Sequence, residues 1–486
     1  MSGSTAGEVA GMPSAGIAIV LRRVTEALIL VGTASLVYWP PIHRGPMIVP
    51  LRAELPFAIA LVLAVIEMSS RPRGSGREAL FGEAEARWTW IALGVLLGAC
   101  LLATGLSWFR YHLRFDAIGQ DTMLKLIFNL LIFALVYRAL RTNAGLFQKL
   151  ALALFLSTLV PLGLGLLVII DPHTHAFLTG TLRLPSIVSG GARFQGLTSN
   201  PVMGTFDSLT GIAFFYVLAL WGLGAGAWRV VGVASVVGGM GILVLWSQAR
   251  SALIALLCLI AMAGIAGIRL LGRGLGQQIL VIALVALVIF FGWRLVPTGL
   301  GMAETSPQIL LERRLVKEED VGSRLAIYRY YMHLIPSNPL GVGFNYTQEF
   351  VVDTPFQKGV ASHSSFFELW MFGGFGAVFA AAAVLVFACA RVMRELRAMV
   401  QRGGLVEVAD VSYLAAALAC FSYWIQTTLV GSPFDETINS VLLAMLLAGI
   451  AQRGVGEART PIHALSGWIA GIGYLILLGL GLRTVL

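Results

Sequence analysis

Charged residues are scarce in this sequence of 486 residues, where Asp, Glu, Lys and Arg make up 12%, roughly half of their share in a soluble globular protein. Hydrophobic residues make up 57%, which is more than a single soluble core can bury. The apolar residues recur in runs of about 20, the length of a helix that crosses a bilayer. The composition excludes a soluble protein and predicts a polytopic membrane protein.

Cysteine is also rare. The four cysteines, Cys100, Cys258, Cys389 and Cys420, each fall inside an apolar run, and no CxxC pair is present. Such cysteines behave as small hydrophobes, so neither a zinc site, a redox pair nor a disulfide framework is expected. The net charge of +9 comes without a nucleic-acid-binding module, and we expect it to act on membrane orientation and anionic lipid. No nucleic-acid partner and no cofactor are expected.

Sustained apolar runs, bounded by charges or by Gly and Pro, predict an all-α protein with 12 or 13 transmembrane helices. The first run follows Arg22 and Arg23 and is too long for a cleaved signal, so we take it as the first span. The runs lie near residues 24–40, 54–70, 89–108, 121–140, 147–170, 202–222, 229–246, 250–270, 278–297, 364–390, 410–430, 436–452 and 464–483.

Three regions follow from this spacing. Residues 1–297 hold the first nine predicted helices, residues 298–363 form one large helical segment between spans, and residues 364–486 hold the remaining helices. With the N-terminus inside, the inner connectors hold eighteen Lys and Arg residues against nine in the short outer connectors. The positive-inside rule therefore places the segment 298–363 and the loop 171–201 on the outer side.

The stretch 391–402, RVMRELRAMVQR, is basic and amphipathic. Its spacing predicts a helix at the cytoplasmic surface, where its arginines anchor the protein against anionic headgroups.

Four residues on the outer side are candidates for chemistry: Arg193, Arg250, Arg324 and His363. An arginine at a helix end commonly extends to the headgroups, and this simpler interpretation applies to each of them. Arg193 and Arg250 have no acidic residue nearby in sequence, whereas Arg324 follows an acidic run and can form a local salt bridge. An ionised group near the bilayer otherwise needs a partner, a water-filled cavity or a substrate.

The order of these motifs resembles the O-antigen ligase and polymerase family. The chain reads RFQGLTSNP, then SQAR at the start of a span, then GSRLAIYRYYMHLIPSNPLGVGFNY, then SHSSFFELWMFGGFGA. The family shares an outer arginine, a polar turn with arginine, an arginine followed by P-x-x-G-x-G, and a histidine opening a span with G-G-x-G. The resemblance covers roughly residues 190–450. The chain departs from the family pattern directly after the histidine, where the family often has Asn and this chain has Ser364.

The resemblance implies a glycosyltransferase of the bacterial inner membrane with its active site facing the periplasm. Ligases of this family move a polysaccharide from undecaprenyl pyrophosphate to the lipid A-core oligosaccharide. The single large outer segment before the histidine favours the ligase branch over a repeat-unit polymerase or a protein O-oligosaccharyltransferase. The expected partners are the lipid-linked glycan donor, the lipid A-core acceptor and membrane lipid.

The residue types fit this reaction without a metal. Guanidinium groups present a fixed fork of donors to phosphate oxygens, so Arg193, Arg250 and Arg324 are predicted to bind the departing pyrophosphate. A neutral imidazole can take the proton of an acceptor hydroxyl, so His363 is predicted to be the general base of a single inverting displacement. A second role for His363, hydrogen bonding without proton transfer, stays open. Glu368 lies about 140° around the helix from His363, so we do not expect it to orient the imidazole.

Other candidates have simpler interpretations. His173 and His175 with Asp171 form at most a weak metal pair, since no third ligand lies nearby. Tyr328, Tyr330 and Tyr331 are typical of an interfacial belt, with a sugar platform as the alternative. The aromatic residues of the span after the histidine, Phe366, Phe367 and Trp370, are expected to pack against lipid or the polyprenyl chain.

A transporter is the alternative from a different functional class. The sequence shows no repeat of 20–50 residues and no inverted pair of helices broken by Gly or Pro. In a lipid or solute transporter, the outer arginines would bind an anionic headgroup only.

Overall fold

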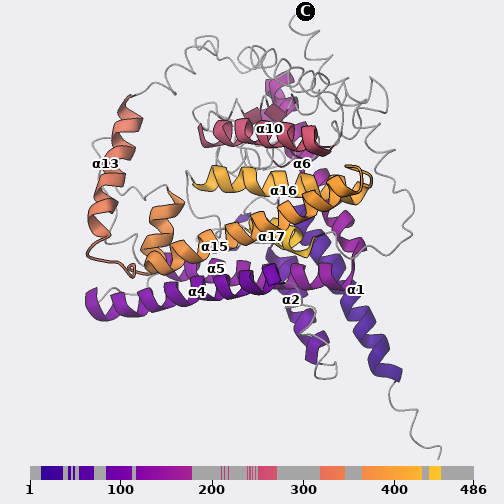
Figure 1. Ribbon diagram of the computed structural model, residues 1–486, viewed down its shortest axis with the longest axis horizontal. Helices are drawn as coiled ribbons and strands as arrows, with labels where there is room; N and C mark the ends of the chain where they lie inside the picture. The colour runs from indigo at the N-terminus through magenta and orange to yellow at the C-terminus, as the bar shows by residue number, and fades with distance from the viewer. Residues whose placement is uncertain are drawn as a thin grey trace, which may run out of the picture.

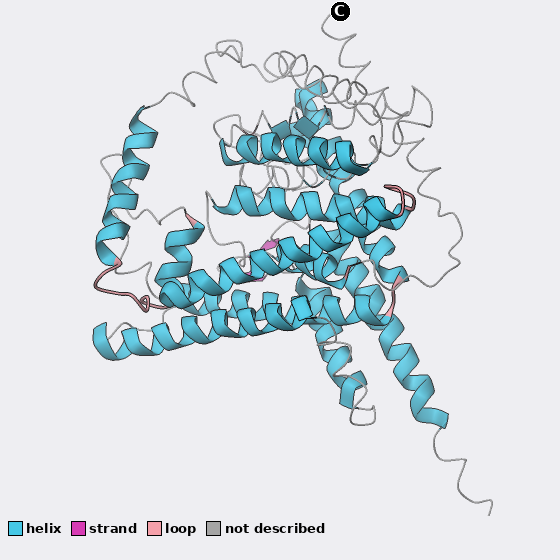
Figure 2. Ribbon diagram, viewed as in Figure 1, coloured by secondary structure: helices cyan, strands magenta, loops and turns pink. Residues whose placement is uncertain are grey.

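The computed structural model describes residues 12–36, 42–44, 47–49, 54–69, 84–111, 117–177, 250–270, 318–344, 364–428 and 437–449, together with single positions between 210 and 247. These residues are helical except for loops and one short hairpin (Figure 2). The hairpin pairs β1 (Ile42–Arg44) with β2 (Met47–Val49) in antiparallel fashion. Within the described ranges, it is the exception to the predicted all-α architecture.

The helices are labelled in Figure 1. They are α1 (Met12–Ser35), α2 (Glu54–Ser69), α4 (Ala84–Tyr111), α5 (Ala117–Thr142), α6 (Gly145–Ile170), α7 (Pro172–Ala176), α10 (Arg250–Leu270), α13 (Glu318–Leu334), α15 (Ser365–Gln401), α16 (Val408–Thr428) and α17 (Thr437–Ala448).

Five helices of the described part are long and apolar enough to cross a membrane, and they confirm a helical membrane protein. These are the segments Arg87–Phe109, Thr122–Thr142, Gly145–Gly165, Ser365–Gln401 and Val408–Thr427.

Several predicted runs fall outside the described ranges. Those near 278–297 and 464–483 do so entirely, and those near 202–222 and 229–246 meet them only at single positions. The total of 12 or 13 spans therefore stays a prediction, as does the division into three regions.

The longest packed pair of helices, α4 and α15, runs antiparallel. A Cβ atom on Gly373 of α15 would lie 2.9 Å from the backbone nitrogen of Cys100 in α4. Towards the other end of the pair, the rings of Trp88 and Phe387 stack with centroids 6.5 Å apart. The end of α4 therefore lies beside the start of α15.

A second set of contacts orders α16 and α17. Tyr413, near the start of α16, donates a hydrogen bond to the carbonyl of Leu446 near the end of α17 (3.1 Å). Near the opposite ends, the Trp424 indole donates to the side-chain oxygen of Asn439. Ser365 at the start of α15 donates to the carbonyl of Thr427 at the end of α16 (3.0 Å). The pairs α16–α17 and α15–α16 are thus antiparallel.

These contacts define two ends of the helix bundle. At the first, which we call the basic end, α10, α15 and α17 finish and α16 begins; Gly404 packs there against the carbonyl of Leu270. At the second, which we call the motif end, α10, α15 and α17 begin and α4 and α16 finish. The ring stack of Phe147 on Tyr413 places the start of α6 at the basic end (6.1 Å).

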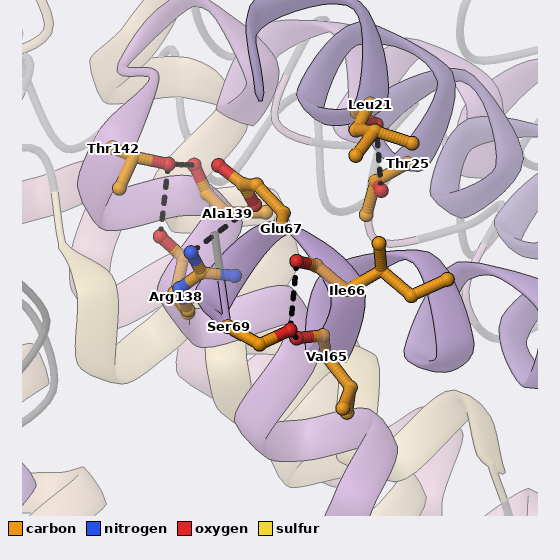
Figure 3. A network of polar contacts seen from close by, with 9 residues as sticks. All are labelled: Leu21, Thr25, Val65, Ile66, Glu67, Ser69, Arg138, Ala139 and Thr142. Atoms are coloured by element: carbon orange, nitrogen blue, oxygen red, sulfur yellow. Dashed lines mark hydrogen bonds and ion pairs between the residues drawn. The ribbon is translucent and has the colours of Figure 1, made fainter. Parts of the chain in front are cut away.

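Charged residues at the basic end pair with one another. Arg138 of α5 reaches Glu67 of α2 at 3.1 Å (Figure 3). Arg402 reaches Asp410 at 3.1 Å, between α15 and α16. The acids of both pairs are buried, and a buried charge needs such a partner because removing it from water is costly.

The stretch 391–402 differs from the predicted surface helix, because it forms the last turns of α15 without interruption. Arg391 is only 1% exposed and pairs with Glu395 at 2.7 Å, while Arg394 on another face is exposed. The Arg391 guanidinium also donates to the carbonyl of Ala448 (3.4 Å) and packs against Gly449. One face of this basic stretch therefore holds α17 in place.

Candidate functional site

Helix α15 is broken near its start, at the motif end. Gly373 and Gly374 have non-helical backbone angles, with φ −149° and ψ 23° at Gly373 and φ 62° and ψ −157° at Gly374. The positive φ of Gly374 is a conformation that side chains disfavour. The break separates residues 365–372, which we call the entry segment, from the long remainder of the helix (Figure 1).

The turn 338–344 fills this break. In an unbroken helix, the amide of Phe375 would donate to the carbonyl of Met371. Here the Phe375 amide donates to the Pro339 carbonyl (3.2 Å), and the Met371 carbonyl accepts from the amides of Val342 (2.8 Å) and Gly343 (3.0 Å). The turn therefore replaces this helical hydrogen bond on both sides, so that the Phe375 amide and the Met371 carbonyl each have a partner.

The glycines of the two motifs permit this close approach. A Cβ atom on Gly341, whose φ is 79°, would lie 2.5 Å from the nitrogen of Gly374 and 2.6 Å from the carbonyl of Trp370. A Cβ atom on Gly343, whose φ is 83°, would lie equally close to Thr104 of α4. The segments 339–343, which reads P-x-G-x-G, and 373–376, which reads G-G-x-G, are thus two halves of one backbone junction. The amides of Val342 and Gly343 donate their hydrogen bonds within it.

Thr104 joins this junction to α4. Its hydroxyl accepts a hydrogen bond from the amide of Phe344 (3.2 Å) and donates one to the carbonyl of Cys100 (2.7 Å). Sequence reasoning missed this residue, because a threonine inside an apolar span gives no indication of a partner 240 positions away.

The entry segment also packs against α13. Phe367 stacks on Tyr331 with centroids 5.6 Å apart and planes 29° apart, and contacts Tyr328 at 5.3 Å. Tyr331 is fully buried. Burial raises the pKa of Tyr331, and the nearby Tyr330 and Glu368 act in the same direction. Tyr331 therefore packs inside the protein, which corrects both predictions for it, an interfacial belt and a sugar platform.

Two of the three aromatic side chains expected to pack against lipid or the polyprenyl chain are instead buried in the protein. Phe367 packs on α13, and Trp370 has no exposed surface. Phe366 is 41% exposed, which fits the prediction. The prediction was wrong for Phe367 and Trp370 because the break turns this part of α15 towards α13 and the turn 338–344.

The predicted site residues occupy the motif end, as far as the structure describes them. Arg250 is the first residue of α10, and Arg324 lies in the second turn of α13. Ser364, which caps the start of α15, directly follows His363 in the chain. His363 and Arg193 lie outside the described residues, as do the side chains of Arg250 and Arg324. The grouping of these four side chains stays a prediction.

Glu368 is a further polar residue of the entry segment. It lies near the first turn of α15 and is only 8% exposed. An acid close to a helix start is stabilised by the helix dipole. Sequence reasoning weighs Glu368 only as a partner of His363; a single acid inside an apolar span is also, by itself, a signal of a functional position.

Asp171 has a structural role at the start of α7. Its carboxylate accepts hydrogen bonds from the Thr174 hydroxyl and the His173 amide, both at 3.0 Å. These bonds lower the pKa of Asp171. Among the described residues there is no group of three or more His, Cys, Asp or Glu side chains that could hold a metal ion; the side chain of His175 lies outside them.

Comparison with known proteins supports the motif assignment. The family model described as O-antigen ligase matches residues 233–382. This range holds α10, α13, the turn 338–344 and the break in α15, and it includes Arg250, Arg324 and His363 but not Arg193. A search of curated proteins found no match. The match supports the resemblance seen in the motifs: residues 233–382 are similar to the O-antigen ligase family.

Proposed function

We propose that this protein is an O-antigen ligase, which transfers a polysaccharide from undecaprenyl pyrophosphate to the lipid A-core oligosaccharide. The observation that carries the proposal is the family match at residues 233–382, over a region where the two glycine motifs form one junction. That junction fixes the chain that follows His363 beside the helix that carries Arg324.

The orientation in the membrane follows from the two ends of the bundle. The basic end holds Arg138, Arg391 and Arg402. The positive-inside rule therefore assigns the basic end to the cytoplasmic side of a bacterial inner membrane. The motif end then faces the periplasm. This is the side on which a lipid-linked glycan meets its acceptor in the proposed reaction.

The proposed reaction is a single displacement. An acceptor sugar oxygen attacks the anomeric carbon of the donor, and its proton passes to the imidazole of His363. The bond between the anomeric carbon and the pyrophosphate oxygen breaks, and the electron pair leaves with the lipid pyrophosphate. Attack from the opposite face inverts the anomeric centre. In the alternative role, His363 hydrogen bonds the acceptor or the pyrophosphate without taking the proton.

Arg193, Arg250 and Arg324 are proposed to bind the departing pyrophosphate. Donors fixed in a poorly hydrated site stabilise developing charge more than they would in water. Three guanidinium groups thus take the role that a divalent metal has in other enzymes, and the proposed reaction needs no metal.

Purified protein in liposomes, supplied with a lipid-linked glycan and lipid A-core, tests the proposal. We expect a joined glycan–lipid A product, formed equally well in the presence of EDTA. Loss of activity that Mg²⁺ restores would contradict the metal-free mechanism. Product formed on a second lipid-linked glycan would indicate a polymerase, and product formed on a peptide would indicate a protein glycosyltransferase. Translocation of the donor without any product would indicate a transporter.

A further inference from the structure

Helix α13 stands beside the bundle, at the left of Figure 1. Two sets of contacts between described residues attach it. At its end, the chain continues into the turn 338–344, which is fixed in the break of α15. Along its length, Tyr328 and Tyr331 pack on Phe367 of the entry segment.

Of the described side chains of α13, Tyr331 inserts most completely. It is fully buried, whereas its neighbours Arg329 and Met332 are exposed. The ring of Tyr331 lies nearly parallel to that of Phe367, at a centroid distance typical of a favourable aromatic pair. This stack sets the separation between α13 and the entry segment.

The helical register relates this stack to the predicted chemistry. Residues four and seven apart share one face of a helix, so the position of Arg324 lies on the same face of α13 as Tyr328 and Tyr331. On the other side of the stack, Phe367 lies four residues after His363 in the chain. The stack therefore lies between the helix that carries position 324 and the entry segment, which follows His363 in the chain.

We infer that Tyr331 is a positioning residue, which holds Arg324 and His363 at the separation that the transfer reaction requires. This inference rests on the proposed function. Tyr331 takes no part in bond making; it acts through the placement of α13. Misplacing a reacting group by about 1 Å can cost as much as 10²-fold in rate.

Leucine at position 331 is the informative substitution, because it removes the ring and keeps the site apolar. We expect Tyr331→Leu to lower kcat about 10- to 100-fold, with KM for the donor nearly unchanged. Tyr331→Phe keeps the ring and is expected to keep kcat within about threefold of wild type. Hydrogen exchange of the amides of α13 should be faster in Tyr331→Leu, because the helix loses its side contact.

The matched control is Phe147→Leu. It breaks a similar buried stack at the basic end, where the rings of Phe147 and Tyr413 lie 6.1 Å apart with planes at 27°. We expect Phe147→Leu to lower thermal stability while leaving both the kcat of folded protein and exchange in α13 unchanged.

The outcomes separate this inference from the proposed function. If wild-type protein transfers glycan and Tyr331→Leu retains normal kcat, the inference is wrong and the proposed function stands. Equal losses of kcat in Tyr331→Leu and Phe147→Leu would also overturn it, because they would indicate general destabilisation. An equal loss in Tyr331→Phe would show that the ring stack is not the cause. If the wild-type protein transfers nothing, both proposals fail.

Discussion

The two ends of the helix bundle are built from different interactions. At the basic end, charged side chains bond to one another, as in the pairs Arg391–Glu395 and Arg138–Glu67. At the motif end, the contacts that shape the described chain come from glycines, aromatic rings and backbone groups. Charge therefore has a structural role at one end, whereas at the other the charged residues of the motifs are proposed to act on a substrate.

This difference predicts two kinds of variant. Substitution of a charged motif residue should abolish transfer and leave the fold intact. Substitution of a charged residue at the basic end should weaken the fold and leave the chemistry intact.

Replacement of the proposed base should have the largest effect. General base catalysis contributes about 10²- to 10⁴-fold, so we expect His363→Ala to lower the rate of glycan transfer by at least about 10²-fold. The measurement is transfer in liposomes at matched protein amounts, with membrane insertion unchanged. Retained activity would remove His363 from the mechanism.

The proposed pyrophosphate clamp requires the shape of guanidinium as well as its charge. Arg250→Lys keeps the charge but loses the two-pronged donor geometry, and we expect a loss of about 10²-fold in transfer rate. The control is Arg394→Lys at the basic end, an exposed residue for which we expect no loss. Near-normal turnover of Arg250→Lys would mean that charge alone is sufficient.

The backbone junction should tolerate no side chain at its centre. Gly374→Ala places a Cβ atom at positive φ against the backbone of Pro339 and Leu340, and the strain alone costs about 1–3 kcal/mol. We expect lower thermal stability and reduced transfer, measured on the same preparation. Gly98→Ala in α4 meets no atom within 4 Å and should have neither effect. Equal tolerance of both alanines would refute the junction.

The smallest effect on turnover is expected at the basic end. Glu395→Gln leaves the buried Arg391 without its acid, and breaking such a pair costs about 3 kcal/mol. Thermal unfolding should occur at a lower temperature, while the transfer rate of the folded fraction stays at the wild-type value. A selective loss of transfer would show that this pair affects the site.

Much of the helical fold is predictable from the sequence, because the length and composition of apolar runs follow the bilayer. The runs near 54–70, 147–170 and 250–270 lie on helices with closely matching bounds. The break at Gly373 and Gly374 was not predicted, because a Gly-Gly pair inside a span is also compatible with close helix packing. Its cause is the turn 338–344, which only the folded chain brings to it.

The candidate site was predictable only in part. The spacing of the motifs identified Arg250, Arg324 and His363 within a region that the family model matches. The environment of Phe367 and Trp370 was not predictable, because an apolar side chain in a span can face lipid or protein equally well. Thr104 and Tyr331 owe their roles to tertiary contacts that leave no pattern in the sequence.

A structure of the protein with a lipid pyrophosphate donor bound would locate the pyrophosphate site. We expect the diphosphate at the motif end, with guanidinium nitrogens of Arg193, Arg250 and Arg324 about 2.7–2.9 Å from its oxygens and His363 beside the anomeric carbon. A diphosphate bound through a metal ion, or away from these four residues, would overturn the proposed metal-free arginine clamp.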